Sequence, residues 1–135
     1  MAAFQKVKVY DDKVQILAMH SKYPQFKSKR TKEGYIEFSG VLRVKPELPE
    51  YSVFIIYRRN ISPLIYVLSP KLVVDAPHIY PTTNSLCLYH PDLFKWNKTK
   101  LIAKEIMTWT AGWIYFYEAW LQTGLWLGPE AAHEI

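Results

Sequence analysis

The residue of this chain with the clearest chemical potential is its single cysteine, Cys87, which lies in the segment APHIYPTTNSLCLYHPDLFKW, residues 76–96. A thiol can act as a nucleophile that carries an acyl group, or it can pack as a small hydrophobic group. Leucines flank the cysteine on both sides, but turn formers and titratable residues lie close by in the sequence: His78, Asn84 and His90. Such a polar loop favours a reactive thiol over a buried core residue.

The composition limits what this thiol can do. One cysteine excludes an intramolecular disulfide and a multi-cysteine zinc or iron–sulfur site. The chain has 135 residues, of which 50% are hydrophobic and 21% charged, so we expect one folded domain spanning residues 1–135. Residues 1–60 hold twelve Lys and Arg against six Asp and Glu, whereas residues 61–135 hold five against six. The basic run at residues 22–32 is therefore either a solvated face or a docking surface for an acidic partner or nucleic acid.

The elements before the cysteine predict a helix followed by an antiparallel sheet. Residues 11–20 read as a short helix that Asp11 or Asp12 can cap. Its apolar side is predicted to contain Val14, Leu17 and Ala18. Apolar residues then alternate from residue 36 to residue 44, and two further apolar runs follow at residues 51–57 and 64–68. Three strands joined by short turns predict a β-meander, with the second strand in a central place.

The elements after the third strand are a long loop and a long helix. Residues 70–96 follow neither a helical nor a strand pattern, and loops of this length in a compact domain are usually functional. Asn97 is a plausible N-cap for a helix that runs to about residue 122 and ends before Gly124. One apolar stripe along this helix, predicted to face the core, contains Ile102, Ile106, Trp109, Trp113, Tyr117 and Trp120. The order of elements is an α+β layout, with the long helix packed on the sheet.

The cysteine segment resembles the active-site region of ubiquitin-conjugating enzymes. In that family a helix and a β-meander precede a His-Pro-Asn turn, a cysteine followed by leucine, a tryptophan and a long helix. The corresponding residues here are Pro77-His78-Ile79-Tyr80-Pro81, Leu86-Cys87-Leu88 and Trp96, and the order of elements matches over residues 11–122. The His-x-Tyr-Pro turn and the Trp-rich last helix are most similar to stand-alone bacterial homologues of antiphage operons, including cyclic-oligonucleotide signalling (CBASS) systems.

The resemblance implies a catalytic role for three residues. Cys87 would accept an activated C-terminal acyl group as a thioester and pass it to an amine or another nucleophile. Negative charge that develops on the carbonyl oxygen needs a donor, which could be a backbone N–H group of the loop, Asn84 or His78. His78 could also activate the incoming nucleophile or orient the loop. The chain departs from the family because its turn contains no asparagine, and Asn84 could simply shape a turn. His90 and Asp92 are better explained as ordinary turn residues.

The resemblance also implies partners. The acyl group would come from the C-terminus of a cGAS-like nucleotidyltransferase (a cyclase) or of a ubiquitin-like protein, with an activating enzyme as a further candidate partner. In ubiquitin-conjugating enzymes the first helix and the residues after it meet the activating partner, and here this region carries the basic excess. No cofactor and no metal ion are expected. The absence of a signal sequence or a long apolar run predicts a cytoplasmic protein without a membrane partner.

Three other functions remain open at this stage. The chain could be a non-catalytic homologue that positions a cyclase or a ubiquitin-like partner, and the missing asparagine supports this alternative. A cysteine hydrolase of the Cys–His type would need a third member that the sequence does not show. Nucleic-acid binding is less favoured, because the aromatic residues lie mostly in the helical stripe and do not alternate with Lys and Arg.

Overall fold

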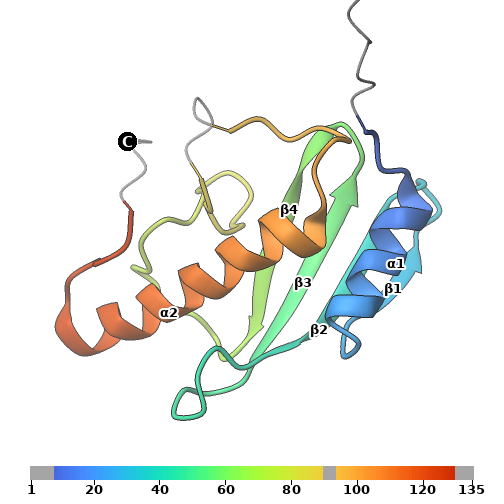
Figure 1. Ribbon diagram of the computed structural model, residues 1–135. Coiled ribbons are helices and arrows are strands. Elements are labelled where there is room, and N and C mark those ends of the chain that lie inside the picture. Colours follow the sequence, from blue (N-terminus) through green and yellow to red (C-terminus); the bar gives the residue numbers. More distant parts are fainter. Residues whose placement is uncertain (1–7, 90–93, 130–135) are drawn as a thin grey trace, which may run out of the picture.

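The computed structural model describes residues 8–89 and 94–129. Its elements are helix α1 (Asp12–Lys22), strands β1 (Lys27–Arg30), β2 (Ile36–Leu42), β3 (Tyr51–Arg58) and β4 (Ile61–Ser69), a π-helical turn η1 (Ile102–Ile106) and helix α2 (Met107–Thr123). The four strands form one antiparallel sheet in the order β1-β2-β3-β4. Both helices lie on the same face of this sheet, α1 beside β1 and β2 and α2 across β3 and β4 (Figure 1). The predicted α+β class, with a helix at each end of an antiparallel sheet, is confirmed.

Strand β3 has the central place that its sequence predicts. Four of its side chains are almost completely buried and alternate with half-buried ones: Tyr51, Val53, Ile55 and Tyr57. The period of two places them on the face that the helices cover, where they join one hydrophobic cluster with the inward residues of β2, η1 and α2. The opposite face of β3 is only half-buried.

The sheet contains one strand more than the sequence predicts. The sequence KSKR forms β1, which pairs with β2 through the register Lys27↔Ser39 to Arg30↔Ile36. All four of its side chains are exposed, so no apolar alternation marks it as a strand. It forms because the chain turns back at Gly34, whose φ of 87° favours glycine, and pairs its backbone with β2. The predicted basic run is thus an exposed edge strand, a typical place for lysine.

Helix α1 is capped as predicted but buries a different face. The Val14 N–H group donates to Asp11 Oδ1 at 2.9 Å, which confirms the aspartate cap. The predicted apolar side is wrong for two of its three residues, because Leu17 is 58% exposed and Val14 is 39% exposed, whereas Ala18 packs against the core. The buried residues are Met19 and Gln15, and the Gln15 amide joins α1 to the beginning of η1 through two hydrogen bonds. The hydrogen bonds of Gln15 decide which face of α1 is buried, and a search for apolar periodicity does not detect such bonds.

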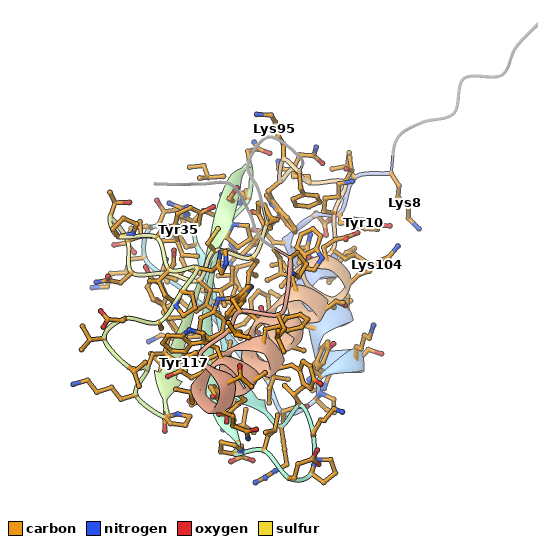
Figure 2. The ribbon with its side chains drawn as sticks, turned by 90° about the vertical axis from the view of Figure 1, so that its left-hand side faces the viewer. Lys8, Tyr10, Tyr35, Lys95, Lys104 and Tyr117 are labelled. Carbon is orange, nitrogen blue, oxygen red and sulfur yellow. The ribbon has the colours of Figure 1, made fainter. Side chains whose placement is uncertain are left out.

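The long helix begins later than predicted. The Asn97 side chain accepts from the Thr99 N–H group at 2.9 Å, so it caps a separate turn, and η1 starts only at Ile102 without a side-chain cap. Helix α2 ends at Gly124, which has a φ of 75°. The predicted stripe faces the core: Ile102, Ile106, Trp113 and Tyr117 are buried, and Trp109 and Trp120 are half-buried. In the side view of Figure 2, Tyr117 lies within the body whereas Lys104 projects from it. Among the residues that the structure describes, no helix has the length and apolar character that crossing a membrane requires.

Candidate functional site

Cys87 lies in a small two-stranded hairpin, residues 78–87, which we call the cysteine hairpin. The Cys87 N–H group donates to the His78 carbonyl at 2.8 Å, and the Tyr80 N–H group donates to the Ser85 carbonyl at 2.9 Å. A second contact fixes the hairpin to the sheet, because the Leu86 N–H group donates to the Ile65 carbonyl of β4 at 2.8 Å. The cysteine is therefore attached to the edge of the sheet and does not sit in an irregular loop.

The turn of the cysteine hairpin explains the asparagine that precedes the cysteine. Asn84 has a φ of 59°, a conformation that asparagine tolerates better than most residues, and its N–H group donates to the Tyr80 carbonyl at 2.8 Å. Its side chain is exposed, and within the described part of the chain no hydrogen bond of this side chain is found. The structure places Asn84 in the turn that brings Tyr80 and Cys87 onto facing strands.

The thiol of Cys87 is buried and is held by polar neighbours. Cys87 is only 4% exposed, and its Sγ lies 3.6 Å from the Tyr89 carbonyl oxygen, to which it donates. The Tyr80 hydroxyl hydrogen-bonds the thiol from the opposite strand of the hairpin. Burial is the main influence on the pKa of the Cys87 thiol and raises it above its ordinary value, while the Tyr80 side chain and the Tyr89 backbone act in the opposite direction.

Tyr80 is a side chain of the candidate site that the sequence analysis did not select. Its hydroxyl hydrogen-bonds Cys87, and burial is the main cause that raises the pKa of Tyr80 above its usual value near 10. The phenol therefore keeps its proton at neutral pH and can donate to the sulfur. The sequence held a signal for it, because Tyr80 follows His78 by two residues and so projects from the same side of a strand. That signal is visible only once residues 78–87 are recognised as a hairpin.

His78 contributes to the site first through its backbone. Its carbonyl accepts from the Cys87 N–H group at 2.8 Å and from the Trp113 indole N–H group at 3.2 Å, so it links the cysteine to α2. Its φ of 56° is unusual for a residue other than glycine. Its half-buried imidazole packs against the ring of Trp126, with 4.7 Å between the ring centroids. The structure thus brings His78 next to Cys87 along the backbone.

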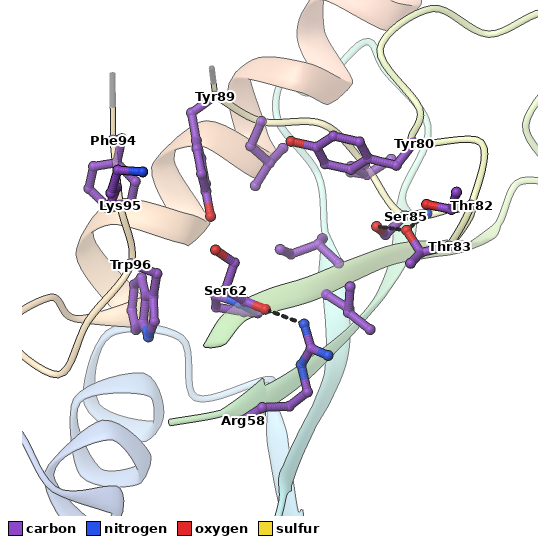
Figure 3. A pocket seen from close by; sticks show the side chains of 15 residues that line it. Arg58, Ser62, Tyr80, Thr82, Thr83, Ser85, Tyr89, Phe94, Lys95 and Trp96 are labelled. Carbon is purple, nitrogen blue, oxygen red and sulfur yellow. Dashed lines mark hydrogen bonds between the residues drawn. The ribbon is translucent and has the colours of Figure 1, made fainter. Parts of the chain in front are cut away.

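A pocket of about 440 Å³ lies beside the cysteine hairpin (Figure 3). Tyr80 and both neighbours of the cysteine, Leu86 and Leu88, line it. The other walls are residues of β4, hydroxyl-bearing residues of the hairpin turn, and the chain after the cysteine: Arg58, Ser62, Pro63, Leu64, Ile65, Thr82, Thr83, Ser85, Tyr89, Phe94, Lys95 and Trp96. Figure 3 shows the Tyr89 hydroxyl pointing toward Ser62. Among these described lining residues two carry positive charge and none is a carboxylate.

The two polar residues that follow the cysteine and were interpreted as turn residues, His90 and Asp92, lie outside the described residues. Within residues 8–89 and 94–129 there is no group of three or more His, Cys, Asp or Glu side chains that could hold a metal ion. The basic strand β1 is exposed at the edge of the sheet opposite to β4, the strand that carries the cysteine hairpin.

The comparison with known families agrees with this geometry. A family model described as "Type II CBASS E2 protein" matches residues 15–134 of the chain. No curated protein matches the chain. The family match confirms the resemblance to the ubiquitin-conjugating homologues of CBASS operons and covers most of α1, the sheet, the cysteine hairpin and α2.

Proposed function

The chain belongs to the type II CBASS E2 protein family, and on that premise we propose that it carries a protein C-terminus as a thioester on Cys87 and transfers it to an amine. One observation carries the proposal: the only thiol of the chain lies in a hairpin that also holds Tyr80, and Tyr80 and both neighbours of the cysteine line a pocket. A CBASS nucleotidyltransferase is the proposed source of the C-terminus, because the family belongs to that defence system.

The first step forms the thioester. The Cys87 sulfur attacks the carbonyl carbon of a carboxyl group that a partner has already activated, for example as a thioester on an activating enzyme. The new S–C bond forms, the thiol proton passes to solvent, and the partner's thiolate leaves with its electron pair. In the second step an amine attacks the same carbon, Cys87 leaves as a thiolate that is reprotonated, and the amine loses a proton to solvent. The product is an amide.

The proposed donor to negative charge is the Tyr80 hydroxyl. It lies against the sulfur and keeps its proton at neutral pH, so it can stabilise the thiolate that attacks and later leaves. This role differs from that of the missing asparagine, whose amide would act on the carbonyl oxygen, and Asn84 is proposed to shape the turn. His78 is proposed to hold Cys87 in place through its carbonyl group.

The burial of the thiol suits a carrier. A thiol with a raised pKa is mostly protonated at neutral pH and reacts slowly with small electrophiles. It is also a poorer leaving group, so a thioester on it survives longer before water attacks. Because Cys87 is only 4% exposed, acylation requires a partner that opens or enters the site. The pocket, with hydroxyl groups, two cations and no carboxylate among its described walls, suits the polar backbone of a short peptide segment whose C-terminal carbonyl is joined to the sulfur.

The experiment is an acyl-transfer assay read by intact mass. The protein is mixed with its operon's nucleotidyltransferase, ATP and an activating enzyme, and a thiol-reducible adduct is expected on Cys87. Cys87→Ser should give an adduct that resists reduction, since an oxygen ester forms in place of the thioester. Tyr80→Phe should slow adduct formation at least about tenfold, whereas Tyr35→Phe at a surface tyrosine serves as the matched control and should not.

A second candidate function is a non-catalytic module that positions the cyclase. The observation in its favour is the same burial, since a thiol that is 4% exposed and has a raised pKa also fits an inert core residue. It predicts no adduct under any condition and full phage protection from Cys87→Ala. Loss of protection in Cys87→Ala, with unchanged binding to the nucleotidyltransferase, supports the carrier instead.

A further inference from the structure

The chain beyond α2 returns to the cysteine hairpin through one side chain. After Gly124, residues 125–129 run back along the molecule. Leu125 and Leu127 are 62% and 61% exposed, whereas Trp126 between them is half-buried and packs against the core. Successive side chains of an extended segment point to opposite sides, so Trp126 is the one of the three that turns toward the body. The structure therefore shows a specific contact made by Trp126.

The contact of Trp126 is with His78 and with the aromatic residues of α2. The Trp126 and His78 ring centroids are 4.7 Å apart, with 47° between the ring planes. Trp126 also lies 6.0 Å from Trp113 and 6.0 Å from Phe116, centroid to centroid. Because Trp113 donates its indole N–H group to the His78 carbonyl, two tryptophans hold the same residue, one by its backbone and one by its ring.

The residue they hold is in a conformation that needs support. His78 has a φ of 56°, which is sparsely populated for a residue with a side chain and persists only where the surroundings fix it. The same residue accepts the Cys87 N–H group and lies two positions before Tyr80, whose hydroxyl bonds the thiol. A change in the backbone of His78 would therefore move the Tyr80 hydroxyl relative to the sulfur.

The path of the returning segment depends on a glycine. A Cβ atom on Gly128 would lie 2.5 Å from the Phe116 ring, closer than real Cβ atoms come to other atoms. The segment can pass Phe116 and bring Trp126 to His78 because this position has no side chain. Gly128→Ala is thus a way to disturb the contact without changing either tryptophan.

We propose that Trp126 is a positioning residue, which packs on His78 and so keeps the Tyr80 hydroxyl in register with the Cys87 thiol. The role of Trp126 in acyl transfer rests on the proposed function. The coupling between Trp126 and Tyr80 can nevertheless be measured from the reactivity of the Cys87 thiol alone. The residue does not touch the sulfur, and it acts through the hairpin.

The first measurement tests the contact. The ring protons of His78 are assigned by NMR from their loss in His78→Gln, and their chemical shifts are compared in the wild type and the variants. An upfield ring-current shift is expected in the wild type, partial retention in Trp126→Phe and its loss in Trp126→Leu. Leu127→Ala is the matched control on the same segment, and it should leave the shift in place. A His78 shift that is unaffected by Trp126→Leu overturns the proposal.

The second measurement tests the coupling to the thiol. The rate of Cys87 alkylation by iodoacetamide is followed from pH 7 to pH 11 in four proteins: wild type, Tyr80→Phe, Trp126→Leu and the double variant. Tyr80→Phe is expected to reduce the rate at pH 8 by about three- to tenfold in the wild-type background, because the thiolate loses a donor. In the Trp126→Leu background its effect should fall below about twofold.

The two proposals fail in different ways. An effect of Tyr80→Phe that is equal in both backgrounds overturns the positioning role of Trp126, even if wild-type protein forms the thioester. Coupling in the alkylation assay without any thioester adduct supports the positioning role and overturns the acyl-carrier function. If Trp126→Leu does not fold, Gly128→Ala takes its place in the test. Gly128→Ala should reproduce the loss of coupling between Trp126 and Tyr80, and full coupling in this variant would count against the proposal.

Discussion

The strongest prediction for the fold concerns Gln15, a polar side chain that is 0% exposed in the contact between α1 and η1. Its Nε2 donates to the Lys100 carbonyl at 2.7 Å, and its Oε1 accepts from the Ile102 N–H group at 3.0 Å. Gln15→Met keeps the volume of the side chain and removes both bonds. The Ile102 N–H group is then left without its acceptor in a buried site, a loss of about 1–3 kcal/mol. The Lys100 residue is only half-buried, so water can replace its partner.

The expected result is a decrease of about 2 kcal/mol in the free energy of unfolding, measured by urea titration. The corresponding decrease in Tm is roughly 6–10 °C for a domain of this size. Leu17→Met on the exposed side of the same helix is the control, and it should change stability by less than about 0.5 kcal/mol. If Gln15→Met is as stable as the control, the amide does not join the two elements and the reasoning is wrong.

Two further predictions concern polar contacts of the folded state. The buried Tyr51 hydroxyl donates to Glu118 on α2, so Tyr51→Phe should decrease the free energy of unfolding by about 1.5–3 kcal/mol in urea titrations at pH 7. For Asp12, the hydrogen bond from Arg59 is the main cause that lowers the carboxyl pKa below its ordinary value. A carboxyl group whose pKa is lower in the folded state stabilises the fold at pH values above its unfolded-state pKa near 3.9. This contribution is lost as the pH falls through the folded-state pKa. The stability difference between wild type and Asp12→Asn should therefore shrink from pH 5 to pH 2, as followed by urea titrations across this range.

The sequence predicts the parts of the fold that follow apolar periodicity. The nearly continuous apolar run at residues 51–57 correctly gives the central strand, and the stripe along residues 102–120 correctly gives the buried face of the last helix. Periodicity fails where backbone pairing or polar contacts decide. Strand β1 has four exposed side chains, and the buried face of α1 contains Gln15, whose two hydrogen bonds connect residues about 85 positions apart.

The candidate site, like the fold, is predicted only in part from the sequence. The cysteine and its neighbours His78 and Asn84 could be selected from residue type and spacing, and the family resemblance could be stated from the same segment. Tyr80 could not, because its role depends on the hairpin register that places it opposite Ser85 and within reach of Cys87. Trp126 is harder still, since an aromatic residue after the end of a helix looks like ordinary core until the chain is seen to return to His78.

The state of the thiol separates the two kinds of cysteine enzyme that the sequence left open. In a Cys–His hydrolase the imidazole lowers the thiol pKa and produces a permanent thiolate that can attack an unactivated amide or ester. In this chain burial is the main influence on the Cys87 thiol, and it raises the pKa. A mostly protonated thiol attacks an unactivated amide slowly, so the proposed transfer starts from an acyl group that a partner has already activated. Tyr80 donates to the sulfur without forming an ion pair with it, and so offers stabilisation that grows as negative charge develops. This combination fits exchange between thioesters, in which bond energy is conserved and the protein contributes position.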